Sequence, residues 1–106
     1  MIIMELNEIF KELDALPYDK IEEYLETKIA EASLAKRIDL TIPLYNELIG
    51  FLRDTTQFDK GKSCKQRLID ELNNNNQQGS MNYATSMLNI ANYDRAAGDY
   101  TSSKAE

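Results

Sequence analysis

The stretch from Asn82 to Tyr100 reads NYATSMLNIANYDRAAGDY and decides the predicted fold. Its apolar side chains recur every three or four residues, which is the spacing of one stripe on a helix. They are Tyr83, Met87, Ile90 and Ala91. Gly98 predicts the end of this helix, and Asp99 predicts the N-cap of another short helix after it. The stretch therefore predicts a helix, a glycine turn and the start of a second helix.

The same periodicity predicts four helices before this stretch. They cover roughly residues 3–15, 21–37, 41–55 and 59–72, and the polar segment 73–80 is a loop. Helix N-caps favour Asp, Ser and Thr. The expected caps of the second to fifth helices are Asp19, Thr41, Asp59 and Ser80. Pro43 is expected in the first turn of the third helix, where proline is tolerated.

The composition favours an all-α protein with one domain. The chain has 106 residues, of which 42% are hydrophobic, with only 4 Gly and 2 Pro. The formal net charge of -6 disfavours a nucleic-acid partner, because a polyanion is repelled by an acidic protein. One basic run interrupts the acidity, and we interpret it as a solvated helix face. It consists of Lys60, Lys62, Lys65 and Arg67.

The residues that usually carry catalysis are scarce. The sequence has no histidine, which removes the commonest general base and metal ligand. Cys64 is the only cysteine, and we expect it to be a small core residue. No apolar stretch approaches the roughly 18 residues of a membrane span. We therefore expect a cytoplasmic protein that is not an enzyme and has no cofactor, metal site or membrane partner.

An internal period of 42 residues relates the third helix to the fifth. The offset aligns Arg53 with Arg95, Leu48 with Ile90, Phe51 with Tyr93 and Phe58 with Tyr100. The first helical pair fits more loosely, at a period of 40, through Ile29 and Ile69. The period predicts about two and a half helical hairpins.

Two short motifs resemble those of a known repeat family. Gly98-Asp99-Tyr100 looks like the turn of a tetratricopeptide repeat (TPR), and Ile90-Ala91 looks like its leucine-small pair. The 42-residue period is similar to that of kinesin light chains. In the second unit, Thr56 replaces the turn glycine. The resemblance implies a right-handed α-α superhelix with hairpins at about 3–37, 41–75 and 80–106, the last one incomplete.

The resemblance also implies a function. TPR arrays bind a peptide or helix of a partner protein on a concave face formed by the first helix of each hairpin. The partner-binding residues that it implies are Asn46, Arg53, Asn89, Asn92 and Arg95. The asparagine amides would pair with a peptide backbone, and the arginines would favour a carboxylate.

Two other functions remain open, as does self-association. The array could instead be a regulatory, peptide-sensing module of a larger signalling protein. Alternatively, the chain could be a plain helical bundle used for oligomerisation. The incomplete last hairpin would leave apolar surface uncovered, so we expect that homo-oligomers can form through it.

Overall fold

The computed structural model describes residues 4–75 and 80–105, which form helices and contain no strand. The helices are α1 (Leu6–Asp14), α2 (Ile21–Leu34), α3 (Ile38–Asp54), α4 (Phe58–Asn74) and α5 (Met81–Ala105), with a 3-10 turn, η1 (Tyr18–Lys20), before α2. The all-α prediction is confirmed for this part of the chain.

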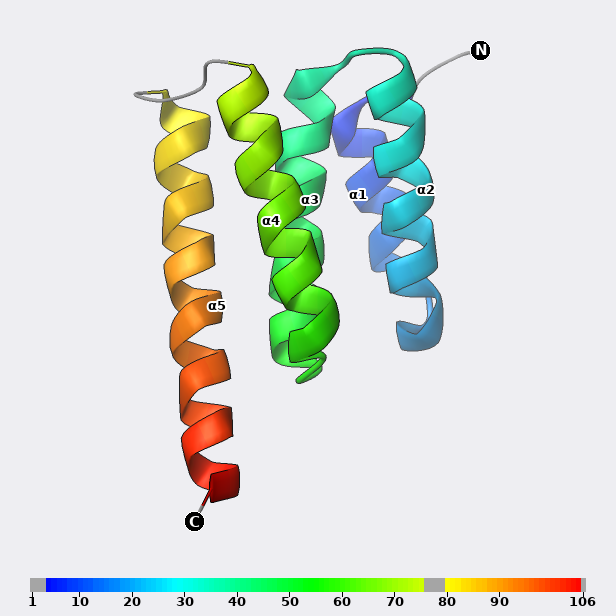
Figure 1. Ribbon diagram of the computed structural model, residues 1–106. Helices are drawn as coiled ribbons and strands as arrows, with labels where there is room; N and C mark the ends of the chain where they lie inside the picture. Colours follow the sequence, from blue (N-terminus) through cyan, green and yellow to red (C-terminus); the bar gives the residue numbers. More distant parts are fainter. Residues whose placement is uncertain (1–3, 76–79, 106) are drawn as a thin grey trace.

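The helices form a flat body in which α3 is central. Helices α1, α3 and α5 run in one direction, and α2 and α4 run in the other (Figure 1). Helix α3 packs against α2, α4 and α5. The body measures 51 × 35 × 18 Å, so its shortest dimension is about the thickness of two packed helices.

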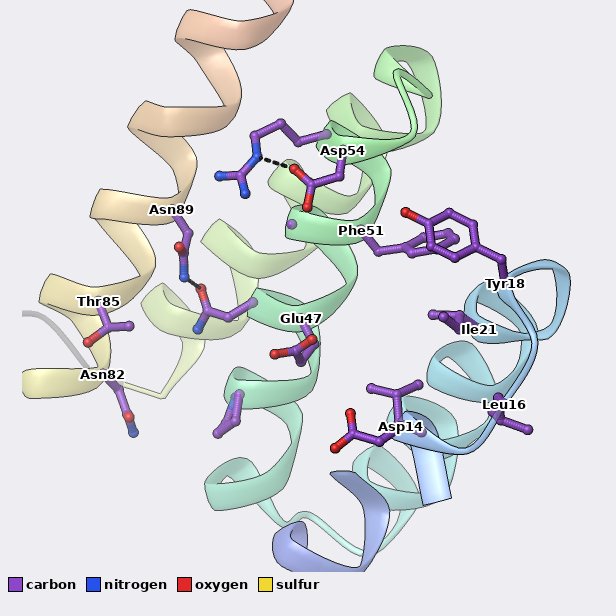
Figure 2. A pocket seen from close by; sticks show the side chains of 15 residues that line it. Asp14, Leu16, Tyr18, Ile21, Glu47, Phe51, Asp54, Asn82, Thr85 and Asn89 are labelled. Atoms are coloured by element: carbon purple, nitrogen blue, oxygen red, sulfur yellow. Dashed lines mark hydrogen bonds and ion pairs between the residues drawn. The ribbon is translucent and has the colours of Figure 1, made fainter. Parts of the chain in front are cut away.

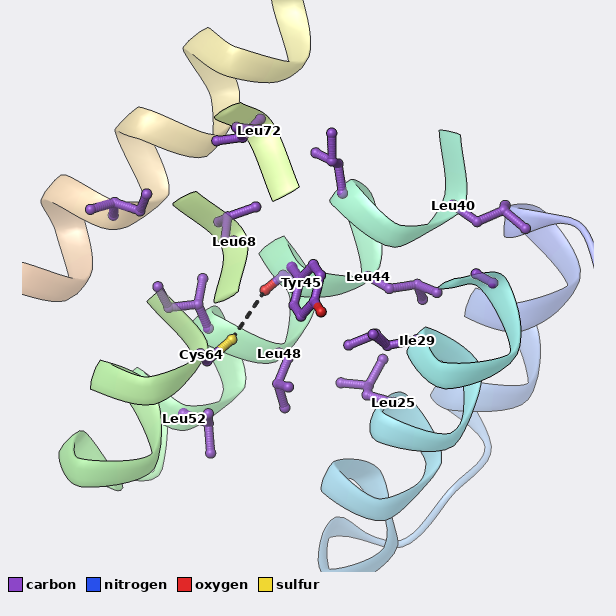
Figure 3. Close-up of a cluster of buried hydrophobic side chains, with 14 of the residues drawn as sticks. Leu25, Ile29, Leu40, Leu44, Tyr45, Leu48, Leu52, Cys64, Leu68 and Leu72 are labelled. Atoms are coloured by element: carbon purple, nitrogen blue, oxygen red, sulfur yellow. Dashed lines mark hydrogen bonds between the residues drawn. The ribbon is translucent and has the colours of Figure 1, made fainter. Parts of the chain in front are cut away.

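The core lies on both sides of α3. Leu25 and Ile29 of α2 pack toward Leu44 and Leu48 of α3, and α4 contributes Leu68 on the opposite side (Figure 3). All these side chains are fully or almost fully buried. Truncating one of them to alanine is expected to cost about 2–5 kcal/mol, because it leaves a cavity that the neighbours only partly fill.

Two tight turns reverse the chain, one between α2 and α3 and one between α3 and α4. A residue in the left-handed region lies two positions after the end of α2 and of α3; these residues are Lys36 and Thr56, each with a φ of 56°. After α3, Thr56 N–H donates to Arg53 O and Gln57 N–H donates to Leu52 O. These two bonds are those of a Schellman motif. Thr56 thus adopts the conformation that the repeat pattern assigns to glycine.

Only one of the four expected helix caps is confirmed. Tyr83 N–H donates to Ser80 Oγ at 3.1 Å, which makes Ser80 the N-cap of α5. The predictions for Asp19, Thr41 and Asp59 are wrong. The 3-10 turn contains Asp19, whereas α3 and α4 begin before Thr41 and Asp59. Helices α3 and α4 each start two residues after the left-handed residue of a Schellman turn, so Arg37 and Gln57 occupy the N-cap positions, and neither makes a side-chain capping bond.

The start of α3 corrects one further prediction. The helix begins at Ile38, so the residues expected to break the chain, 39–41, form its first turn. Pro43 consequently lies in the second turn of α3 and not in the first.

The predicted helix break at Gly98 is wrong. Helix α5 is continuous over 25 residues, so Asp99 caps nothing and there is no sixth helix within 81–105. Ring contacts hold this part of α5 against the start of α4. Phe58 lies 6.0 Å from Tyr93 and 4.9 Å from Tyr100, measured between ring centroids. Because Tyr93 and Tyr100 are seven residues apart, one straight helix presents both rings to Phe58.

Candidate functional site

A groove of about 760 Å³ lies on the side of the body formed by α1, α3 and α5. We call it the α1–α3–α5 groove. Helix α3 forms its floor, the end of α1 and the connection to α2 form one wall, and α5 forms the other wall (Figure 2). Its lining comprises Leu13, Asp14, Leu16, Tyr18, Ile21, Pro43, Asn46, Glu47, Gly50, Phe51, Arg53, Asp54, Asn82, Thr85 and Asn89.

Helical spacing explains why these residues meet. The floor residues recur along α3 every three or four positions, and the wall residues 82, 85 and 89 do the same along α5. Such residues occupy one side of a helix. Gly50 lies in the middle of the floor, and a Cβ added there would meet nothing within 4 Å. The groove is therefore open above Gly50.

A polar link joins the floor to the α5 wall. Asn46 Nδ2 donates to Ile42 O and to Ser86 Oγ, both at 3.0 Å. Because a carbonyl can only accept, this arrangement fixes the amide orientation of Asn46 and leaves its Oδ1 as an acceptor. Asn89 Nδ2 donates to that oxygen at 2.9 Å. Asn46 thus positions α5 on α3, while Asn89 Oδ1 has no hydrogen-bond partner among the described residues.

The groove is acidic. Asp14, Glu47 and Asp54 line it, and Arg53 is the one basic residue in the lining. Arg53 Nε donates to Asp54 Oδ1 at 3.0 Å, so these two charges are paired. Asp14 and Glu47 form no ion pair with any described residue. Burial, and next the negative charge of Asp14, raise the pKa of Glu47.

Two aromatic rings also line the groove. The ring centroids of Tyr18 and Phe51 lie 5.3 Å apart in a tilted arrangement. Tyr18 is mostly exposed, and Figure 2 shows both rings beside Ile21. The groove therefore offers an apolar contact surface next to a pair of unpaired carboxylates.

Three of the five residues expected to bind a partner line this groove: Asn46, Arg53 and Asn89. Asn92 and Arg95 lie further along α5 and do not line it, and Arg95 donates to Asn92 Oδ1 at 3.1 Å. Sequence reasoning missed Glu47 and Asp54, although they adjoin Asn46 and Arg53 on the same side of α3. Asp14 gave no such signal, because it lies on a different helix.

Comparisons with known proteins found no relative of this chain. No family model, curated protein or solved structure matches this chain. Helices long and apolar enough to cross a membrane are absent from the described ranges 4–75 and 80–105.

Three residues of the basic run on α4 form ion pairs with neighbouring helices. Lys60 pairs with Glu22 of α2, and Lys65 pairs with Asp94 of α5. Arg67 donates to both carboxylate oxygens of Glu26, each at 2.8 Å. Such bidentate pairs fix geometry as well as charge. These three cations consequently face acids of this chain on the α4 side, away from the groove.

The cysteine is buried in the core between α3 and α4 (Figure 3). Burial is the main cause that raises the pKa of Cys64 to about 12. A thiol with such a pKa is almost entirely protonated at neutral pH, so it is a poor nucleophile. Its role is packing, as expected from the sequence.

Proposed function

We propose that this chain is a non-enzymatic scaffold that binds an extended peptide segment of a partner protein in the α1–α3–α5 groove. The single observation that carries the proposal is the groove of about 760 Å³, formed by the three helices that run in the same direction. In a TPR-like array, the same three helices would be the first helices of successive hairpins. Direct packing of α5 on α3 supports that arrangement.

The lining has the chemistry that peptide recognition requires. Asn82, Thr85 and Asn89 form a row of polar side chains along one wall, where they can pair with backbone amides and carbonyls. Tyr18 and Phe51 can pack against an apolar side chain of the same segment. A mostly preformed groove also lowers the cost of ordering the protein on binding.

A blocking substitution tests the proposal. In Gly50→Tyr, the new ring would fill the groove from its floor, where a Cβ has free space. Gly98→Tyr is the matched control, because Gly98 is also helical, open to a Cβ and outside the groove. Both variants must first show the melting temperature and helicity of a folded protein.

The readout is binding of peptides selected from a random phage-displayed library on the wild-type protein. We expect the selected peptides to bind the wild type and Gly98→Tyr equally and to lose at least about tenfold in affinity for Gly50→Tyr. Equal binding to both variants would contradict the proposal. Failure to select any peptide that binds in solution would also contradict it.

A further inference from the structure

The charged residues that line the α1–α3–α5 groove indicate which kind of peptide segment it would bind. Three carboxylates and one guanidinium line it, and the guanidinium of Arg53 is already paired with Asp54. Two negative charges, those of Asp14 and Glu47, remain without a cation among the described residues. In Figure 2 both carboxylates point into the same part of the groove.

The negative charge of Asp14 also acts on Glu47. Burial is the main cause that raises the pKa of Glu47, and the charge of Asp14, which points into the same part of the groove, adds to it. A bound cation between them would relieve this repulsion and gain attraction from both. A cationic side chain is therefore the electrostatically favoured neighbour of this pair of carboxylates.

We propose that the occupant of the groove is a basic peptide segment, with a lysine or arginine side chain seated between Asp14 and Glu47. This inference rests on the proposed peptide-binding function and names the chemistry of its ligand. It also revises the sequence-based expectation of a carboxylate ligand, because Arg53 is paired with Asp54 and Arg95 lies outside the groove.

The shape of the site favours an organic cation over a metal ion. No group of three or more His, Cys, Asp or Glu residues close enough to hold a metal occurs in the described part of the chain. Leu13, Leu16 and Ile21 line the same wall of the groove as Asp14. Lysine and arginine have apolar stems that pack on such surfaces while the charged head reaches a carboxylate.

Two labelled octapeptides test the inference, one of alternating lysine and alanine and one of alternating glutamate and alanine. Their affinities are measured by fluorescence anisotropy against the wild type, Gly50→Tyr and two charge variants. The groove variant is Asp14→Asn with Glu47→Gln. The control variant is Glu23→Gln with Asp99→Asn, which makes the same change in net charge at exposed positions outside the groove.

We expect the lysine peptide to bind the wild type and the control variant with similar affinity. The groove variant should bind it about fivefold to tenfold more weakly, because two attractive charges are lost. The glutamate peptide should bind none of these proteins measurably. Added salt should weaken the lysine peptide's binding to the wild type, since part of the attraction is screened.

Three outcomes would overturn the inference. Equal losses in the groove and control variants would show general attraction to an acidic protein. Preference of the groove for the glutamate peptide, blocked by Gly50→Tyr, would overturn the basic ligand but leave the peptide-binding function intact. Unchanged binding of the lysine peptide to Gly50→Tyr would place it outside the groove and count against both.

Discussion

At the scale of single residues, the structure gives Thr41 and Thr55 opposite roles. Thr41 is 1% exposed, and its Oγ1 has no hydrogen-bond partner among the described residues. Thr55 Oγ1 donates to Phe51 O at 2.8 Å and accepts from Gln57 Nε2 at 2.7 Å. A buried hydroxyl without a partner costs free energy, whereas a bonded hydroxyl stabilises the fold.

Thr41→Val should therefore stabilise the protein by about 1 kcal/mol, because valine has the same shape and no polar atom to satisfy. For a domain of this size, that gain corresponds to about 4–8 °C in melting temperature. The measurement is thermal unfolding followed by circular dichroism. Thr55→Val is the control, and it should lose stability by a similar amount. A destabilised Thr41→Val would show that its hydroxyl has a stabilising partner.

The raised pKa of Glu47 predicts that the free energy of unfolding depends on pH. Its carboxyl lies in the groove together with Asp14, and burial, followed by the charge of Asp14, raises its pKa in the folded protein above the ordinary value. The ionised form is therefore disfavoured in the folded state. This cost is absent below the carboxyl's pKa in the unfolded chain, and it is fully present above the raised pKa of the folded state.

Glu47→Gln should consequently be more stable than the wild type at pH 7, by less than about 1 kcal/mol, because burial of the side chain is only partial. The difference should vanish toward pH 3. Urea unfolding of both proteins across this range measures it. Lower stability of Glu47→Gln at pH 7 would mean that the carboxylate has an attractive partner, which would also weaken the case for a basic ligand.

At the scale of helices, Gly61 of α4 and Gly98 of α5 differ in what surrounds them. A Cβ on Gly61 of α4 would clash with the buried ring of Tyr93, whose hydroxyl donates to Phe58 O. Gly98 lies inside α5, and a Cβ there would meet nothing within 4 Å. Gly61 is therefore required by the approach of α5 to α4, and Gly98 is not required by packing.

Gly98→Ala should stabilise the protein by about 0.5–1 kcal/mol, because alanine favours the helix interior over glycine. Gly61→Ala should destabilise it by about 1–3 kcal/mol, because the core around Tyr93 must shift. Chemical denaturation of the two variants measures both effects. A loss of stability in Gly98→Ala would instead indicate the glycine turn that the sequence predicted.

The sequence predicted the existence of α1 to α5 well, because each has apolar residues at helical spacing. It also predicted Ser80 as an N-cap, because a serine hydroxyl can accept from the first N–H groups of a helix. It misplaced the start of α3 for a local reason and the end of α5 for a nonlocal one. The start of α3 depends on the left-handed turn at Lys36, and the continuity of α5 depends on Phe58, a residue of another helix.

At the scale of the whole molecule, part of the groove was predictable and part was not. The family resemblance placed Asn46 and Asn89 on one face, and in the structure their side chains are hydrogen-bonded to each other. The acidic character was predictable only in part: Glu47 and Asp54 adjoin Asn46 and Arg53 along α3, whereas Asp14 comes from another helix. The self-association expected through the last hairpin stays a prediction. Exposed Met81 and Leu88 on α5, at 82% and 62%, are where it would occur.

The central claim is that the α1–α3–α5 groove binds a basic peptide. A titration of the ¹⁵N-labelled protein with the lysine-alanine octapeptide, followed by ¹H–¹⁵N correlation spectra, tests it most directly. We expect the largest shifts on groove residues of α1, α3 and α5, including the side-chain amides of Asn46 and Asn89. Largest shifts on α2 or α4, or on the exposed side of α5 around Leu88, would contradict it, as would no shifts at saturating peptide.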